Sequence, residues 1–147
     1  MLIQLLAGGF VSFINFGIHA VMTGLIVIAT RHTARRTDHL HAFGRVTALM
    51  TVTMIALMCA HVIEIAVWAA FLALANVPIE SMSAFEFAFE NYTALGYGDT
   101  VAGGGWRLIG PITALNGLLL IGWSVAIIFE VMRMAEVQVG RLDERGR

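Results

Sequence analysis

Three long apolar stretches, separated by short polar segments, dominate the pattern along the chain. They cover about residues 2–30, 46–76 and 108–134. About 20 residues of helix cross the hydrocarbon core of a bilayer, so each stretch is long enough to span it. A shorter amphipathic segment, residues 81–92, lies between the second and third stretches. The pattern predicts an all-α integral membrane protein with three transmembrane helices and one short helix that does not cross.

Composition and charge agree with a membrane protein, because 59% of the 147 residues are hydrophobic and only 13% are charged. Residues 31–45 are predicted to form a polar loop with four arginines: Arg31, Arg35, Arg36 and Arg45. Short arginine-rich loops stay on the cytoplasmic side. We therefore expect a multi-pass protein of the cell (inner) membrane, surrounded by lipid, with its N-terminus outside. Residues 135–147 are expected to form a short cytoplasmic tail that extends the last helix.

Polar residues inside the first two apolar stretches form a predicted cluster. His61 and Glu64 lie one turn apart on one helix face, and ionisable groups in a membrane normally turn toward protein. An antiparallel first helix places Asn15 and His19 at a comparable depth. One interpretation is a structural hydrogen-bonded cluster. The other is a functional site that senses protons or binds a metal.

The predicted loop contains three further histidines, His32, His39 and His41. A histidine cluster can sense pH near neutrality or bind a metal. Irregularly spaced histidines in a solvated loop are also ordinary polar surface. The sequence leaves both interpretations open.

The chemically most informative segment follows the short helix and reads Thr93-Ala94-Leu95-Gly96-Tyr97-Gly98-Asp99. It resembles the selectivity filter of potassium channels, whose usual signature is Thr-x-Val-Gly-Tyr-Gly-Asp. Such filters bind a dehydrated cation with successive backbone carbonyls, and glycine permits the positive-φ conformations that this requires. The resemblance implies K⁺ binding by the carbonyls of residues 93–98.

The segment departs from the family pattern at two positions. Ala94 stands at the x of this signature, in place of a threonine whose hydroxyl lines the innermost ion site in the family, and Leu95 replaces the usual valine. The backbone carbonyls survive both changes. We therefore expect K⁺ selectivity to persist, with weaker ion occupancy at the innermost site and reduced block by barium.

The resemblance also assigns roles outside the filter. Glu90 matches a buried pore-helix glutamate of the proton-gated bacterial potassium channel, nine residues before the aspartate matched by Asp99. In that family the two acids share a proton behind the filter, which implies a supporting role for this pair. The alternative is that Glu90 only caps or hydrates the loop.

The third apolar stretch carries the predicted gate. Gly117 falls where the family has its hinge glycine, although close helix packing also explains a glycine there. Four apolar residues recur at helical spacing on one face: Leu118, Ile121, Val125 and Phe129. In an assembled channel this face would line the inner cavity, and Phe129 would form the narrowest ring. The alternative is that the stripe packs on the second helix.

The resemblance to the potassium-channel pore module covers about residues 46–134. It implies an outer helix, a re-entrant pore helix, a filter and an inner helix, at residues 46–76, 81–92, 93–99 and 108–134. One chain supplies one filter strand, and four are needed, so we expect a homotetramer around a central pore. The additional helix, residues 1–30, is expected at the periphery.

The sequence thus favours passive, potassium-selective conduction, with K⁺ as the permeant ion and no other cofactor. Two alternatives stay open: a weakly selective cation channel of the same fold, and a non-conducting membrane sensor or accessory subunit. Enzymatic activity is not expected, because no nucleophile has a base at suitable spacing and no glycine-rich phosphate loop is present. A formal net charge of −1 without a polybasic arm gives no indication of nucleic-acid binding.

Overall fold

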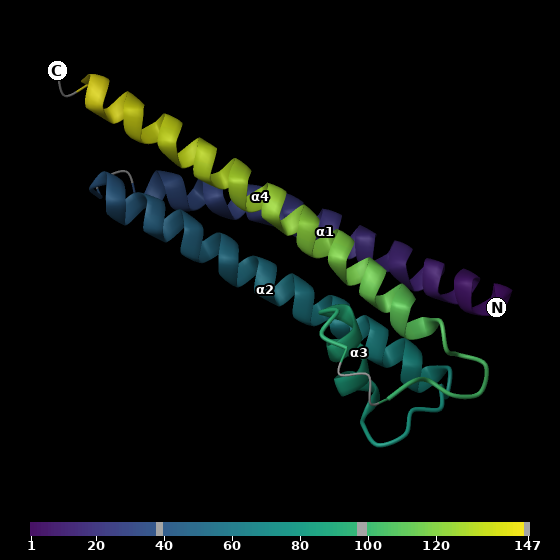
Figure 1. Cartoon of the computed structure of the whole chain (residues 1–147). Coiled ribbons are helices and arrows are strands. Elements are labelled where there is room, and N and C mark those ends of the chain that lie inside the picture. The colour runs from purple at the N-terminus through teal and green to yellow at the C-terminus, as the bar shows by residue number, and fades with distance from the viewer. Residues whose placement is uncertain (38–39, 97–99, 146–147) are drawn as a thin grey trace. The chain divides into compact units, whose positions relative to one another are not determined.

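The computed structural model describes residues 1–37, 40–96 and 100–145, with side chains up to residue 137. This part of the chain is all-helical, without strands, and its elements are α1 (Leu2–Arg36), α2 (Ala42–Leu74), α3 (Ala84–Tyr92) and α4 (Ile109–Arg145) (Figure 1). α1, α2 and the part of α4 up to Val137 are each long and apolar enough to cross a membrane. The predicted fold class, three spanning helices and one short helix, is therefore confirmed.

The polar connection between α1 and α2 is shorter than the predicted loop at residues 31–45. α1 continues to Arg36, and α2 already begins at Ala42. Arg35 and Arg36 lie in the last turn of α1, where positive charge interacts favourably with the helix dipole. Arg31, Arg35 and Arg36, which the sequence predicts to lie in the loop, therefore belong to α1 and extend it beyond its apolar stretch.

α2 ends at Leu74, two residues before the predicted boundary, in a Schellman motif. The N–H of Val77 donates to the carbonyl of Leu72 at 3.0 Å, and the N–H of Asn76 donates to that of Ala73 at 3.2 Å. Asn76 has a φ of 47°, a left-handed conformation that asparagine tolerates better than most residues. This residue therefore stops the helix and turns the chain.

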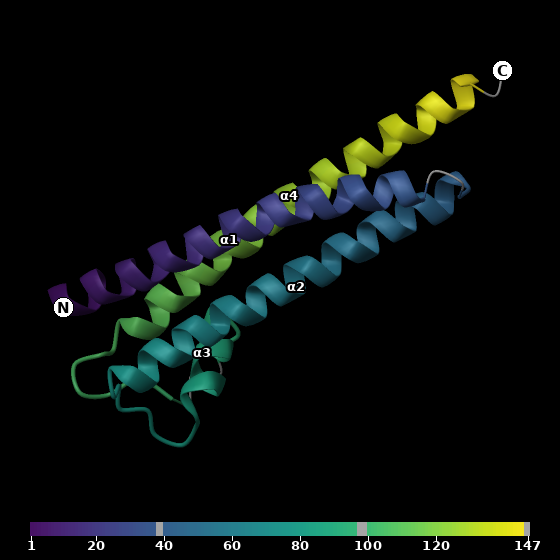
Figure 2. The same ribbon diagram turned by 180° about the vertical axis from the view of Figure 1, so that it is seen from behind.

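The chain divides into two compact units, of which the first comprises Met1–His19 and Ala60–Gly122. It contains α3, which lies beside the C-terminal half of α2 when viewed from either side (Figures 1 and 2). Its apolar core includes the fully buried Trp68 and Ile109 and the almost fully buried Phe87. The short helix is therefore anchored in a hydrophobic core.

α1 belongs to the core of this first unit through contacts with α4. The side chain of Gln4 donates to the carbonyl of Gly105, and its Oε1 accepts from the N–H of Leu108 at 2.9 Å. A Cβ at Gly8 would lie 2.8 Å from Cγ2 of Ile112, so the two helices approach closely there. The additional helix thus packs directly on the beginning of α4.

The second unit comprises Ala20–Cys59 and Trp123–Arg147. The remaining parts of α1, α2 and α4 meet in a second apolar core, whose buried residues are Ile26, Ala34, Leu49, Leu57, Ile127, Val131 and Ala135. α4 continues beyond residue 134, the predicted end of the span, to Arg145. Each unit therefore has its own core.

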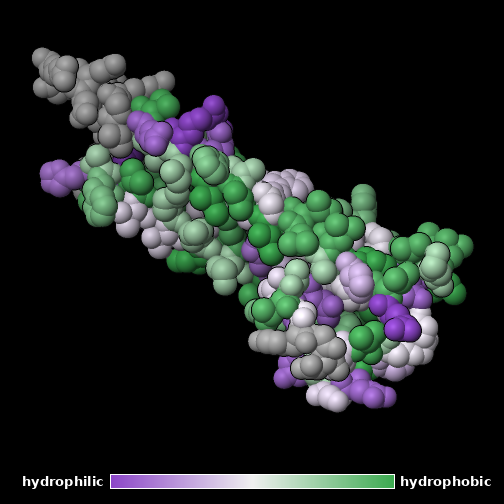
Figure 3. All heavy atoms as spheres, viewed as in Figure 1, coloured by the Kyte–Doolittle hydropathy of each residue, from purple (hydrophilic) through white to green (hydrophobic). Residues whose placement is uncertain are grey.

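Apolar side chains also cover much of the outer surface. Figure 3 shows them over much of one face, and Phe10, Phe13 and Phe129 are among the exposed examples. In water such a surface would be unfavourable, whereas lipid or neighbouring subunits cover it without cost. The distribution of side chains is that of a membrane-embedded helical protein.

Candidate functional site

The short helix α3 begins with a complete capping box. The Oγ of Ser83 accepts from the N–H of Glu86 at 3.2 Å, and a carboxylate oxygen of Glu86 accepts from the N–H of Ser83 at 2.7 Å. These bonds satisfy two helix N-terminal donors that otherwise have no partner within the helix. They also lower the pKa of the exposed Glu86 carboxyl, chiefly through the backbone N–H of Ser83. α3 therefore begins at residue 84, three residues after the predicted start.

The other end of α3 closes in a second Schellman motif, at the beginning of the predicted filter. The N–H of Leu95 donates to the carbonyl of Glu90 at 3.1 Å, and that of Ala94 donates to Asn91 at 2.9 Å. Ala94 has a φ of 55°, the left-handed conformation of this motif. The motif fixes where α3 ends and the next segment starts.

The predicted filter residues that the structure describes are exposed in the single chain: Thr93, Ala94, Leu95 and Gly96. Gly96 has a φ of 48°, the conformation for which glycine was expected at this position. Tyr97, Gly98 and Asp99 lie outside the described residues. Of the predicted supporting pair, Glu90 lies on α3 with a half-buried side chain.

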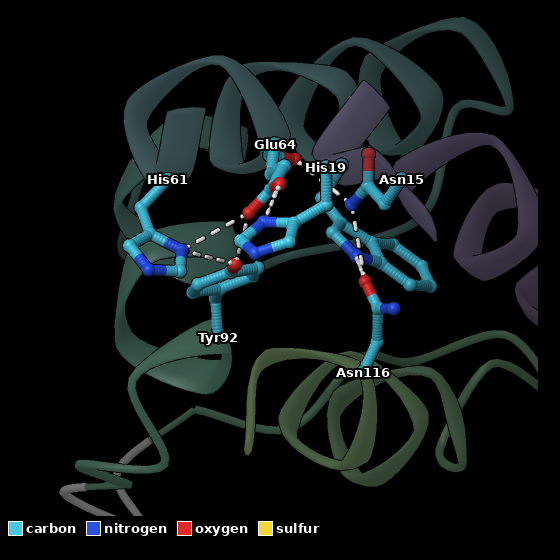
Figure 4. Close-up of polar contacts among 7 residues, drawn as sticks. Asn15, His19, His61, Glu64, Tyr92 and Asn116 are labelled. Atoms are coloured by element: carbon cyan, nitrogen blue, oxygen red, sulfur yellow. Dashed lines mark hydrogen bonds and ion pairs between the residues drawn. The ribbon is translucent and has the colours of Figure 1, made fainter. Parts of the chain in front are cut away.

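Behind α3 lies a buried polar cluster centred on the carboxylate of Glu64 (Figure 4). Oε1 of Glu64 is 2.8 Å from Nδ1 of His19, and Oε2 is 3.0 Å from Nδ1 of His61. The hydroxyl of Tyr92 donates to Oε2 and lies 2.8 Å from Nδ1 of His61. His19, Glu64 and Tyr92 are almost completely buried, and His61 is half-buried. The cluster joins α1, α2 and α3.

The cluster continues through amide groups to α4. The Nδ2 of Asn15 donates to the carbonyl of Glu64 at 3.2 Å and to Oδ1 of Asn116 at 3.1 Å. The same Oδ1 accepts from the indole N–H of Trp68 at 2.9 Å. Asn15, His19, His61 and Glu64, which the sequence placed at comparable depth, are therefore brought together, and every helix contributes to the network.

Sequence reasoning did not include Tyr92, Asn116 and Trp68 in this network. Asn116 carried a usable signal, since an asparagine in the middle of an apolar span needs a partner in protein. Tyr92 and Trp68 gave none, because aromatic residues are common in membrane helices and only the fold reveals that their polar atoms point inward.

Gly117 packs directly against the end of α3. A Cβ at residue 117 would lie 1.9 Å from the carbonyl oxygen of Tyr92 and 2.8 Å from its carbonyl carbon. No side chain fits at this distance. Of the two interpretations of Gly117, close packing therefore has direct geometric support.

The predicted cavity face of α4 is not covered within the chain. Its four residues are all exposed: Leu118, Ile121, Val125 and Phe129. The alternative, a stripe packed on α2, is wrong for the single chain. This face is open to lipid, to solvent or to another copy of the chain.

The sequence offers two groups of histidines as metal or proton sites. Among the described residues, one group of three has ligand atoms close enough to hold an ion, His19, His61 and Glu64. His32 and His41 of the other group are exposed, and His39 lies outside the described residues. Of the two groups, the buried one has the geometry of a metal site in the described part of the chain.

Comparison with known proteins gives one family. Neither the curated proteins nor the solved structures contain a match to the chain. The sequence model of the family described as Ion channel matches residues 57–134, which include the C-terminal half of α2, all of α3 and nearly all of the apolar part of α4. Because this match covers more than half of the chain, the protein belongs to the Ion channel family.

Proposed function

We propose that this protein is the subunit of a potassium-selective channel, in which four copies surround a central pore and K⁺ passes down its electrochemical gradient. One observation carries the proposal: the segment Thr93–Asp99 directly follows the C-terminal end of α3, between two membrane-spanning helices of an ion channel family. A multi-pass membrane protein with this order of elements has the parts that a backbone-carbonyl filter requires.

The end of α3 supports the binding of a cation. The C-terminal end of a helix carries partial negative charge, and α3 has no basic residue in its last turn to neutralise it. The segment that follows it starts with exposed residues, including Gly96 in a left-handed conformation. The resemblance of residues 93–98 to a potassium filter then supports K⁺ as the ion held by the backbone carbonyls.

The exposed face of α4 supports assembly into a homotetramer. A single chain contributes one strand to a filter that needs four, and Leu118 and Phe129 are uncovered apolar residues in the predicted inner helix. In a tetramer, the four copies of each residue would form apolar rings that line the cavity and gate it by dewetting. Glu90 and Asp99 would support the filter from behind.

The orientation in the membrane follows from the arginines at the α1–α2 connection. Arg31, Arg35, Arg36 and Arg45 lie close to this end of the two helices. The positive-inside rule places them in the cytoplasm, which puts the N-terminus and the outer turn outside. The C-terminal residues would then lie in the cytoplasm, and we propose the cell (inner) membrane as the location.

A weakly selective cation channel is the second candidate, favoured by the residue at position 94. Ala94 offers a methyl group where the potassium-channel pattern has a hydroxyl, so the innermost site has fewer oxygen ligands. The rest of the glycine-tyrosine-glycine sequence is intact, which favours the potassium-selective candidate.

The decisive experiment is the reversal potential of the purified protein in planar bilayers with asymmetric K⁺ and Na⁺. The potassium channel predicts reversal near the K⁺ equilibrium potential. Gly96→Ala, which places a side chain at a φ of 48°, should abolish the current or its selectivity. Gly103→Ala is the matched control, because a Cβ there meets Pro78 at an ordinary 3.5 Å.

Other outcomes separate the alternatives. Reversal near zero for the unmodified protein would replace potassium selectivity with weak cation selectivity. Native mass spectrometry should show four chains. A tetramer that conducts under no condition would indicate a sensor or accessory subunit, and a monomer would contradict the channel itself.

A further inference from the structure

The geometry points to a binding site for a divalent transition metal, with Zn²⁺ as the best fit, formed by His19, His61 and Glu64 behind the end of α3. One ligand atom from each residue lies within 4.8 Å of the others. The carboxylate sits between the two imidazoles, and both Nδ1 atoms face it (Figure 4). The inference does not depend on which ion the chain conducts.

The donor set selects the class of metal. Two imidazole nitrogens and one carboxylate are the three-ligand set of many zinc sites, with a fourth position left for water. Ca²⁺ and Mg²⁺ prefer shells made entirely of oxygen. A tetrahedral zinc site places neighbouring ligand atoms about 3.3 Å apart. The two observed Nδ1–Oε distances, 2.8 Å to Oε1 and 3.0 Å to Oε2, are already slightly shorter than this. A metal held by one oxygen of Glu64 requires the three ligand atoms, which lie within 4.8 Å of one another, to draw together around it.

The protonation states of the ligands allow the exchange of hydrogen bonds for a metal. A neutral imidazole has one protonated and one unprotonated ring nitrogen. When the metal binds, the proton of each ring moves from Nδ1 to Nε2, and the Nδ1 lone pair faces the ion. Any proton that does not move to Nε2 leaves to solvent as the metal binds, so binding needs no further reactant.

Tyr92 would contact a metal ligand, Glu64, and not the metal itself. Its hydroxyl donates to Oε2 of Glu64, which orients the carboxylate. Such outer hydrogen bonds typically contribute tenfold to hundredfold in metal affinity. Because Tyr92 is the last residue of α3, an ion here would tie α1 and α2 to the helix that precedes Thr93.

The test is metal binding by purified protein from which any affinity tag has been removed and which has been stripped with a chelator. The chain has five histidines, so a variant with His32→Gln, His39→Gln and His41→Gln retains only the two of the proposed site. We expect this variant to bind one Zn²⁺ per chain by elemental analysis. With Co²⁺ it should show the intense visible absorption of a tetrahedral site.

Removal of a ligand gives the matched comparison. In the same background, His61→Gln should weaken binding at least hundredfold, and Tyr92→Phe should weaken it about tenfold. Circular dichroism verifies that each variant is folded. Unchanged affinity in a folded His61→Gln variant would overturn the proposal.

A measurement on the three-histidine background alone keeps the test independent of ligand variants. X-ray absorption at the zinc edge should show two imidazoles and one or two oxygen ligands. Absence of stoichiometric zinc, or a shell without imidazole, would overturn the proposal and leave the cluster as a metal-free hydrogen-bonded network.

Discussion

Gly117 of α4 faces the backbone carbonyl of Tyr92 so closely that a Cβ at residue 117 would lie 1.9 Å from the carbonyl oxygen. Tyr92 is the last residue of α3, and the predicted filter starts at the next residue. The position of the end of α3 relative to α4 therefore depends on the absence of a side chain at residue 117.

Gly117→Ala should destabilise the protein by about 1–3 kcal/mol or more, because the clash is with backbone that cannot rotate away. Thermal unfolding in detergent, followed by circular dichroism, measures the effect. Gly122→Ala is the control, since a Cβ at Gly122 has nothing within 4 Å in the chain. Equal stability of the two variants would show that the helices do not approach as described, and would restore the hinge as the reason for Gly117.

Asn116 is predicted to be the most sensitive polar residue of α4. Its Oδ1 accepts from both Trp68 and Asn15, so Asn116→Leu leaves the indole N–H without its acceptor. We expect a loss of about 1–3 kcal/mol in the free energy of unfolding.

The control for Asn116 is Thr113→Val. The hydroxyl of Thr113 is equally buried, but its bond of 2.8 Å goes to the carbonyl of Ile109 in the same helix. Removal of this bond should cost less than about 1 kcal/mol. If the two variants lose the same stability in chemical unfolding, the connection from α1 and α2 to α4 does not have the strength inferred for it.

The spans and the short helix could be predicted because apolar stretches of sufficient length have few alternatives in a membrane. The helix ends could not be placed as well. Just past the ends of α2 and α3 lie Asn76 and Ala94, which adopt positive-φ backbone conformations. Glycine is the usual residue at such a position, so its absence removed the sequence signal for both helix ends. Extension of α1 to Arg36 likewise depends on dipole interactions that the apolar pattern does not contain.

For the candidate site too, some residues could be predicted from the sequence and others could not. His61 and Glu64 were recognisable because ionisable groups in a span demand an explanation. Their connection to Tyr92 was not, since it depends on how α3 leans against α2. The contact of Gln4 with Gly105 and Leu108, just before α4, was also missed, because a single glutamine has no distinctive pattern.

The Gln4 contact predicts local protection of the backbone just before α4. The N–H of Leu108 donates to Oε1 of Gln4, so Gln4→Leu should expose this amide to water. If the lost hydrogen bond lowers the free energy of local opening by about 1 kcal/mol, the Leu108 amide should exchange roughly fivefold faster. Hydrogen exchange followed by mass spectrometry on the peptide containing Leu108 measures it. Leu6→Ala, at an exposed position of α1, should leave the rate unchanged.

The capping box of α3 predicts a dependence of stability on acid. The pKa of Glu86 is lowered in the folded state by the backbone N–H of Ser83. The contribution of ionised Glu86 to the free energy of unfolding is therefore complete above the unfolded-state pKa of about 4.3. It is lost as the pH falls through the lower pKa of the folded state. Between pH 6 and about pH 3, Glu86→Gln should lose less stability than the unmodified protein does.

The control for this prediction is Glu80→Gln, which removes the same charge at an exposed position before α3. It should leave the pH dependence of unfolding as it is in the unmodified protein. Identical profiles for Glu86→Gln and Glu80→Gln would mean that the capping box does not contribute to stability in solution.

The innermost ion site gives the last prediction, which rests on the proposed potassium channel. Ala94 supplies no hydroxyl where the potassium-channel pattern has threonine, so barium applied from the inside should block weakly. Ala94→Ser restores a ring of four hydroxyls in a tetramer and should tighten the block by about tenfold, equivalent to about 1.4 kcal/mol. Ala94→Thr adds the same hydroxyl, but its branched side chain is strained at a φ of 55°. Ala94→Val has the shape of threonine without the hydroxyl and should not tighten the block. Ordinary barium affinity in the unmodified channel would show that the hydroxyl ring is not what holds the ion at this site.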